Sequence, residues 1–336
     1  PSLKTRYLMQ IIYASVGIIG GIFVLLIDIK KIQDISEFLY LFGILMLIAT
    51  LLIGTRVRGS KSWIKFGFFS IQPSEFMKLF YILFVAKIIT LYQNDEKYRS
   101  SVKFFIIVGL VTALPAILIL LQPDFGSTFI LVLIFLTIAF LANLNIELLI
   151  LTVIMGVFVF SLPLLRVYLK LIDTTVFIKN LVFSNKYFLI ISALMTIVGV
   201  IILLISTQVE SKTVMRISFI LIGIGISIVL SILADKILAD YQKKRLLVFI
   251  NPELDKLGSG YNIIQSKIAI GAGGLFGKGL FRGTQSQFGF LPERSTDFIF
   301  SIIGEEGGFI LSFLILIIYG TIFVKILTLI RITSSF

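Results

Sequence analysis

Nine apolar stretches, each about as long as a bilayer is thick, constrain this chain more than any other feature. A hydrocarbon core of about 30 Å takes about 20 apolar residues of α-helix to cross. Hydrophobic residues make up 58% of the chain and charged residues 14%, whereas soluble domains average about 45–50% and about 25%. The chain therefore lacks the polar surface to fold in water, and we predict an all-α polytopic membrane protein. The nine predicted spans are residues 7–29, 37–54, 75–92, 102–121, 126–142, 146–166, 187–206, 214–234 and 299–328.

The missing residue types limit the chemistry. The chain has no cysteine, which excludes disulfides and thiolate metal sites. It has no histidine either, so acid–base chemistry falls to Asp, Glu, Lys or Tyr. The formal net charge of +12 favours anionic lipid headgroups or phosphate-bearing substrates. Nucleic acid is not an expected partner, because most of the chain is predicted to lie in a membrane.

Residues 241–296 are predicted to form one large polar loop between two spans. The loop is rich in glycine, and Asp297 follows it where the last apolar stretch starts. Cations around a carboxylate at the bilayer boundary indicate chemistry on an anionic, lipid-linked substrate; the plainer alternative is that Asp297 caps the last helix. The cations of this segment are Lys243, Lys244, Arg245, Lys256, Lys267, Lys278, Arg282 and Arg294.

A second polar connector, residues 59–78, holds the single tryptophan, Trp63, and the sequence Gln-Pro-Ser-Glu at 72–75. A proline tolerates the first position of a helix, so we expect a helix to start at Pro73. Glu75 and Lys78 then lie at i and i+3, close enough to pair. Two interpretations stay open: an interfacial anchor with a helix-end ion pair, or a binding surface.

Two further sets of carboxylates lie beside or inside apolar stretches. Asp124 occupies a short break between two predicted helices, where it is either an N-cap or a functional group close to hydrocarbon. Glu305 and Glu306 lie about two turns beyond Asp297. Carboxylates inside a span must face a polar interior or pair with a cation, so structural and functional roles are both open for them.

Together these stretches resemble the RodA/FtsW/SpoVE family of polytopic cell-wall polymerases, also called SEDS proteins. The sequences GTQSQ and FLPERSTDFIF are more similar to the RodA, elongation-type branch than to the FtsW branch. The matching stretches are residues 63–78, QPDFGS at 122–127, DYQKKRLLVFINPE at 240–253 and the long segment 260–308.

The resemblance implies a family topology of ten spans. We expect this chain to be a fragment that begins just before the second of them and lacks the last two. Residues 170–235 are predicted to be a two-helix insertion, and adding two spans preserves the sidedness of the large loop. We therefore expect a single SEDS-type membrane domain over residues 1–336, with the 241–296 loop at the extracytoplasmic face.

The resemblance also implies the reaction, which polymerises lipid II for cell elongation and rod shape. In it the 4-hydroxyl of an acceptor GlcNAc attacks the anomeric carbon of the donor MurNAc, and undecaprenyl pyrophosphate leaves. Asp297 matches the family's catalytic aspartate, and a positioned carboxylate can take the hydroxyl proton. Glu75 and Asp124 are also candidates to hold Mg²⁺ or Mn²⁺. The expected substrate-binding residues are Trp63, Glu75, Lys78, Asp124, Arg245, Lys267 and Arg282.

Two other functional classes compete with this interpretation. A flippase or transporter of lipid-linked cell-wall precursors would carry charges deep in several spans, or repeats with broken helices; here the ionisable residues gather at one membrane face. A non-catalytic scaffold would not need to keep Asp297 and the 72–75 motif. The family further implies a class B penicillin-binding protein as partner, contact with membrane lipid, and a multi-pass location in the bacterial plasma membrane.

Overall fold

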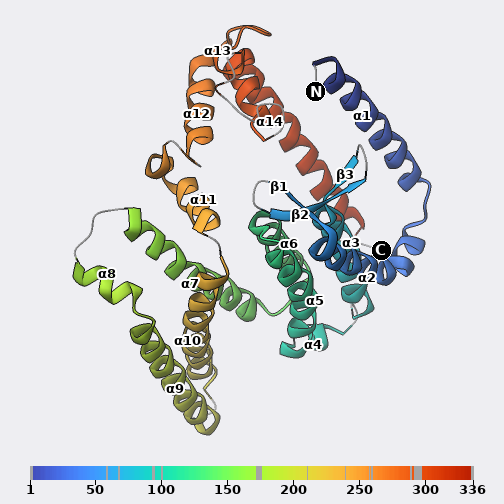
Figure 1. Ribbon diagram of the computed structural model, residues 1–336. Helices are drawn as coiled ribbons and strands as arrows, with labels where there is room; N and C mark the ends of the chain where they lie inside the picture. Colours follow the sequence, from blue (N-terminus) through green and yellow to red (C-terminus); the bar gives the residue numbers. More distant parts are fainter. Residues whose placement is uncertain are drawn as a thin grey trace. The chain divides into compact units, whose positions relative to one another are not determined.

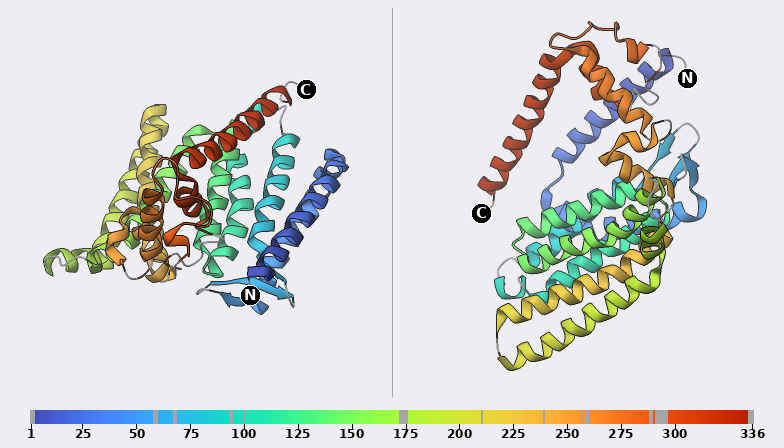
Figure 2. Two further views of the ribbon diagram at one scale, coloured as in Figure 1. Left: turned by 90° about the horizontal axis from the view of Figure 1, so that it is seen from above. Right: turned by 90° about the vertical axis from the view of Figure 1, so that its left-hand side faces the viewer.

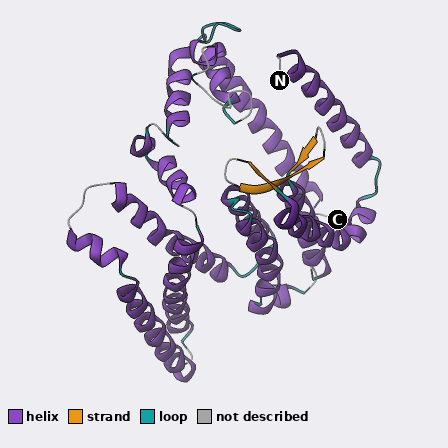
Figure 3. Ribbon diagram, in the orientation of Figure 1, coloured by secondary structure: helices purple, strands orange, loops and turns teal. Residues whose placement is uncertain are grey.

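The computed structural model consists mainly of α-helices (Figures 1 and 3). It divides into two compact units, Pro1–Val157 with Val198–Ile224, and Phe158–Ile197 with Gly225–Phe336. The structure describes residues 3–57, 60–66, 69–92, 95–99, 101–171, 176–209, 211–238, 240–256, 258, 260–287, 290 and 297–333.

The first unit begins with α1 and α2, followed by a small three-stranded antiparallel sheet. The all-α prediction did not include this sheet, which is the only one in the described residues (orange in Figure 3). Thr55 pairs with Trp63, and Ile64 pairs with Ile71. Up to residue 157, the elements of the first unit are α1 (Leu3–Leu25), α2 (Ile29–Ile53), β1 (Thr55–Val57), β2 (Ser60–Phe66), β3 (Phe69–Ile71), α3 (Pro73–Leu91), α4 (Glu96–Arg99), α5 (Val102–Leu121), α6 (Phe125–Leu141) and the first part of α7 (Ile146–Leu171).

The second unit contains the rest of α7 and the C-terminal elements. Helices α9 and α10 cross the boundary between the units, and the predicted polar loop folds into α11, η1, α12 and α13. The elements are α8 (Val176–Phe183), α9 (Asn185–Val209), α10 (Lys212–Ile237), α11 (Asp240–Ile250), the 3-10 helix η1 (Pro252–Asp255), α12 (Tyr261–Gly273), α13 (Thr284–Gln287) and α14 (Ile299–Thr333).

Each of the nine predicted spans corresponds to one long helix, and the chain is a multi-pass membrane protein. Seven of these helices are long and apolar enough to cross a bilayer, so the predicted count of nine is not reached among the described residues. Helix α6 has only 17 residues. Helix α3 carries three charged side chains, Glu75, Lys78 and Lys87. These charges are paired: Lys78 lies 2.8 Å from Glu75, and Lys87 lies 3.1 Å from Glu37 of α2.

The core of the first unit lies between α2, α3, α5 and α6. Buried residues recur at helical spacing, as in Tyr40, Ile44 and Leu47 of α2. Gly43 lets α2 approach α3, since a Cβ there would lie 2.6 Å from the Met77 sulfur. Two interhelical hydrogen bonds add to this packing: Tyr40 Oη donates to the Val111 carbonyl at 2.8 Å, and Tyr81 Oη lies 2.7 Å from Thr112 Oγ1. In lipid, helices associate mainly through van der Waals packing at close approach and through interhelical hydrogen bonds.

Helices α9 and α10 form an antiparallel hairpin, as the views of Figure 2 show. Ser192 Oγ of α9 donates to the Gly225 carbonyl of α10 at 2.7 Å. A Cβ added at Gly225 would lie 2.5 Å from a methyl carbon of Thr196. The hairpin therefore depends on small residues that let the two backbones meet, as expected of packing between helices in lipid.

A buried cluster of charges joins α7, α10 and α11 in the second unit. The carboxylate of Asp235 lies 2.7 Å from Arg166 Nη1 and 2.7 Å from Lys243 Nζ. Arg166 also donates to the Val182 carbonyl at 3.0 Å and to Asn185 Oδ1 at 2.6 Å. The Asp235 carboxylate thus pairs with two buried cations. It connects the predicted insertion, residues 170–235, to α7 and α11.

Glycines let α12 lie against the start of α14 (Figures 1 and 2). A Cβ added at Gly273 would collide with the Gly304 carbonyl oxygen. Beside this contact, Ser266 Oγ and Ser301 Oγ are 2.5 Å apart and hydrogen bonded. The α12–α14 contact is therefore intolerant of side chains at its centre.

We expect Gly273→Ala to lower the free energy of unfolding by about 1–3 kcal/mol, the usual range for overpacking. Gly271→Ala, on the same helix, is the matched control because a Cβ there meets nothing within 4 Å. Alanine is favoured over glycine in a helix by about 1 kcal/mol, so the control should not lose stability. Thermal unfolding in detergent measures both. Equal losses at the two positions would contradict the tight contact.

Candidate functional site

Asp124 links the Gln-Pro-Ser-Glu motif at residues 72–75 to the start of α6. It is the N-cap of α6: its Oδ1 accepts from the Ser127 backbone N–H at 3.1 Å. Its Oδ2 accepts from Ser127 Oγ at 2.8 Å and from Gln72 Nε2 at 2.7 Å. The capping alternative is therefore confirmed. The sequence did not reveal that Gln72 is the partner, because 52 residues separate it from Asp124.

Glu75 and Lys78 form the ion pair that their spacing predicts. Lys78 Nζ lies 2.8 Å from Glu75 Oε1, and the Glu75 side chain is 55% exposed. Glu75 lies in the first turn of α3, after Pro73 at its start, where the helix dipole favours an anion. Glu75 is thus the exposed member of the pair, whereas the Lys78 side chain is only 14% exposed.

Trp63 lies on the central strand of the sheet and is half-buried. Its backbone carbonyl accepts from Thr55 Oγ1 at 3.2 Å. Nearby on the same strand, the Lys61 N–H donates to the Gln122 carbonyl at 3.1 Å, which ties the sheet to the end of α5. This contact and the Gln72–Asp124 hydrogen bond join the strand that carries Trp63, and the start of α3, to the α5–α6 connection that carries Asp124.

The predicted metal ligands do not assemble a metal site. The part of the chain that the structure describes holds no group of three or more acidic residues suited to an ion. Both oxygens of Asp124 already accept hydrogen bonds, and Glu75 Oε1 is paired with Lys78. A hard cation would need several oxygen ligands. Asp124 and Glu75 therefore do not fit the role of ligands to a resident Mg²⁺ or Mn²⁺ ion.

The remaining predicted residues belong to the second unit. Asp297 is exposed in a turn just before Ile299, the first residue of α14. Lys267 is exposed on α12, and Arg282 is exposed in the loop before α13. Arg245 lies on α11, with its side chain outside the described residues.

The adjacent glutamates of α14 hold the loop that carries Arg282. Glu305 is fully buried. Its Oε1 accepts from Lys278 Nζ at 3.0 Å, Thr284 Oγ1 at 3.0 Å and the Gln285 N–H at 2.9 Å. The structure thus assigns this glutamate a positioning contact. Lys278 is the cation that a carboxylate inside an apolar stretch requires.

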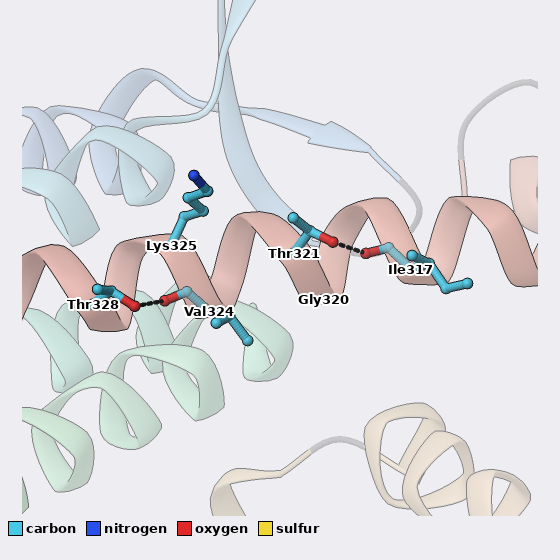
Figure 4. A pocket seen from close by; sticks show the side chains of 6 residues that line it. All are labelled: Ile317, Gly320, Thr321, Val324, Lys325 and Thr328. Atoms are coloured by element: carbon cyan, nitrogen blue, oxygen red, sulfur yellow. Dashed lines mark hydrogen bonds between the residues drawn. The ribbon is translucent and has the colours of Figure 1, made fainter.

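A shallow hollow runs along α14 far from these residues (Figure 4). The two threonine hydroxyls of the hollow are hydrogen bonded within the helix: Thr321 donates to the Ile317 carbonyl and Thr328 to the Val324 carbonyl, at 2.8 Å each. The hollow includes none of the predicted site residues. Its lining residues are Ile317, Gly320, Thr321, Val324, Lys325 and Thr328.

Comparison with known proteins decides the family. The family model FTSW_RODA_SPOVE, described as "Cell cycle protein", matches residues 2–170 and 164–336. The chain belongs to the FtsW/RodA/SpoVE family. This assignment confirms the resemblance that the motifs around Trp63, Asp124 and Asp297 indicated.

Individual members of the FtsW/RodA/SpoVE family align over most of the chain. Peptidoglycan glycosyltransferase RodA of Treponema pallidum (strain Nichols) is 36% identical over 97% of this chain and 75% of that protein. Peptidoglycan glycosyltransferase MrdB of Escherichia coli (strain K12) is 30% identical over 84% of this chain but only 57% of that protein. Stage V sporulation protein E of Bacillus subtilis (strain 168) is 31% identical over 93% of this chain and 66% of that protein.

A solved structure of a peptidoglycan synthase complex that coordinates polymerization and crosslinking has a similar fold. It aligns with a TM-score of 0.50 and 22% identity over 94% of this chain and 67% of that one. This likeness supports the predicted all-α polytopic membrane fold.

The capping role of Asp124 gives a stability prediction for this family member. Asp124→Ala should lower the free energy of unfolding by about 0.5–2 kcal/mol, because the α6 N-cap is lost. Asp124→Asn should lose less, since asparagine caps about as well as aspartate, although its amide nitrogen cannot accept the two hydrogen bonds that Oδ2 accepts. Thermal unfolding of both variants measures the difference. If Asn is as harmful as Ala, the second carboxylate oxygen, which accepts from Gln72 and Ser127, stabilises the fold more than the cap does.

Proposed function

We propose that the complete protein is a peptidoglycan glycosyltransferase that joins lipid II disaccharides into glycan strands for cell elongation and rod shape. The observation that carries the proposal is the exposed carboxylate of Asp297 at the start of the apolar helix α14. The relatives RodA and MrdB bear the name peptidoglycan glycosyltransferase. This chain spans only part of their length, so the activity is proposed for the complete protein.

In this proposal Asp297 is the general base. The 4-hydroxyl of the acceptor GlcNAc attacks the anomeric carbon of the donor MurNAc, and its proton passes to the Asp297 carboxylate. The bond between that carbon and the phosphate oxygen breaks, and undecaprenyl pyrophosphate leaves. A positioned base of this kind contributes about 10²–10⁴-fold to a rate. The absence of histidine from the chain supports a carboxylate in this role.

The leaving diphosphate needs positive charge around it. We assign this role to the exposed cations Lys267 and Arg282, to Arg245, and to Lys78 as oriented by Glu75. Asp124 contributes indirectly, since its hydrogen bond to Gln72 fixes the start of α3. Trp63 offers an aromatic surface for the substrate. Mg²⁺ or Mn²⁺ enters the proposal only as an ion that the diphosphate itself brings.

The proposal also includes a partner protein and a location in the cell. The similar fold of a complex that performs both polymerization and crosslinking supports a crosslinking partner, which we take to be a class B penicillin-binding protein. The proposed lipid-linked substrate supports a location in the bacterial plasma membrane.

Reconstitution of the complete protein into liposomes with purified lipid II tests the proposed function. We expect glycan strands, detected by gel electrophoresis of labelled product, and no faster movement of lipid II between leaflets than in empty liposomes. Flipping without polymer would support the transporter alternative. If protein that unfolds cooperatively shows neither polymerisation nor flipping, the scaffold alternative is favoured.

A further inference from the structure

The connection between α12 and α14 begins with an apolar tip, residues 274–281. Its sequence is GLFGKGLF. Four large side chains project from it with most of their surface exposed: Leu275 at 63%, Phe276 at 81%, Leu280 at 72% and Phe281 at 73%. A polar loop in water would not be expected to gather four such side chains at one turn.

The backbone of the tip is bound to α14 well beyond its first turn. The Phe309 N–H donates to the Gly274 carbonyl at 2.9 Å, and the Ile310 N–H donates to the Leu275 carbonyl at 3.2 Å. From the tip, the Lys278 N–H donates to the Glu305 carbonyl at 3.0 Å. The tip is therefore level with residues 305–310 of α14, and not with Ile299 where that helix begins.

The length of α14 places these residues at the bilayer boundary or below it. Its apolar stretch, Ile299–Leu329, has 31 residues, whereas about 20 suffice to cross the hydrocarbon core. Gly308 interrupts the helix with φ 67° and ψ −166°, and residues 309–329 alone are long enough to span. If the span starts at this kink, the tip lies at the boundary. If it starts at Ile299, the tip lies deeper.

Charges within the tip are paired, as insertion into lipid requires. Lys278 Nζ lies 3.0 Å from the buried Glu305 carboxylate and donates to Thr284 Oγ1 at 2.7 Å. The exposed cations nearby, Lys267 and Arg282, lie outside residues 274–281. This division of apolar tip and flanking cations is that of an interfacial element, whose cations meet lipid phosphates.

Backbone strain gives independent support. Phe281 has φ 61°, a left-handed conformation that is unfavourable for a residue with a Cβ. The Glu306 carboxylate holds it there, accepting from the Phe281 N–H at 3.0 Å. Strained residues persist where the surrounding structure fixes them, and they gather at binding sites. Here the strain presents an aromatic ring outward.

We propose that the 274–281 tip is a membrane anchor: its four apolar side chains insert among the acyl chains of the leaflet where α14 begins. The occupant of this apolar surface is thus lipid. The anchor is independent of the proposed reaction, although it would hold Arg282 and Asp297 close to a substrate embedded in the same leaflet.

Single cysteines report directly on this anchor, because the 336 residues contain none. We would introduce Phe276→Cys into the complete protein, replace any cysteine elsewhere, attach a bimane fluorophore and reconstitute into nanodiscs with lipids brominated near the top of the acyl chain. Phe313→Cys, exposed on α14, is the lipid-facing reference. Lys256→Cys, exposed beside η1, is the water-facing reference.

The brominated lipids should quench residue 276 to the same extent as residue 313, and leave residue 256 unquenched. A membrane-impermeant maleimide should label residue 276 much more slowly than residue 256. Leu280→Cys repeats the test if the first variant is unstable. Quenching at 276 and 280 as weak as at 256 would overturn the proposal, whether water or another protein then covers the tip.

Discussion

Asp297→Asn should reduce glycan polymerisation from purified lipid II by about 10²–10⁴-fold, the contribution of a positioned general base. Asparagine keeps the size and the hydrogen-bonding shape of the side chain but cannot take a proton. Asp297 is exposed in a turn, so the substitution should leave thermal unfolding within about 0.5 kcal/mol of wild type, as is usual at the surface. Initial rates of polymer formation by the complete protein in liposomes measure the effect.

Two variants make the Asp297 result specific. Asp297→Glu keeps the carboxylate at a shifted position and should recover part of the activity. Glu253→Gln removes an exposed carboxylate from η1, where the side chain is 74% exposed, and should leave the rate unchanged. A normal rate in Asp297→Asn, or an equal loss in Glu253→Gln, would remove Asp297 from the role of base.

Asp235→Ala should lower the free energy of unfolding by about 3–5 kcal/mol, the loss expected when one partner of a buried charge pair is removed. The side chains of Arg166 and Lys243 are only 8% and 7% exposed. Without Asp235 these two cations lose the carboxylate that they share. Thermal unfolding in detergent, followed by size-exclusion chromatography, should show a clear fall in Tm.

An exposed pair supplies the control for Asp235. Arg216 Nη2 lies 2.6 Å from Glu147 Oε1, with side chains 57% and 52% exposed. Exposed ion pairs contribute about 0–1 kcal/mol, so Glu147→Ala should scarcely change Tm. Similar changes for Glu147→Ala and Asp235→Ala would show that the Asp235 cluster does not bind the helices of the second unit together.

Local contacts could be predicted from the sequence. The Glu75–Lys78 ion pair follows from i and i+3 spacing on a helix that starts at Pro73, and the structure confirms both. The N-cap at Asp124 follows from its place in a break between apolar stretches. Seven of the nine spans were also predictable, because hydrophobicity and length decide which helices can enter a bilayer.

Long-range contacts could not be predicted. Gln72 and Asp124 are 52 residues apart, and Glu305 and Lys278 are 27 apart. Only the tertiary fold joins such pairs. The small sheet was missed because β1 and β3 have three residues each, too few for an alternating pattern. Asp235 gave no signal because its partners lie on two other helices.

If Asp297 deprotonates a sugar on lipid II, it must face the extracytoplasmic side and meet the substrate there. Asp297→Cys in an otherwise cysteine-free complete protein makes this measurable. We expect a membrane-impermeant maleimide to label the cysteine in intact spheroplasts, and added lipid II to slow the labelling. Labelling that requires permeabilised membranes, or that lipid II leaves unchanged, would contradict the proposed role of Asp297.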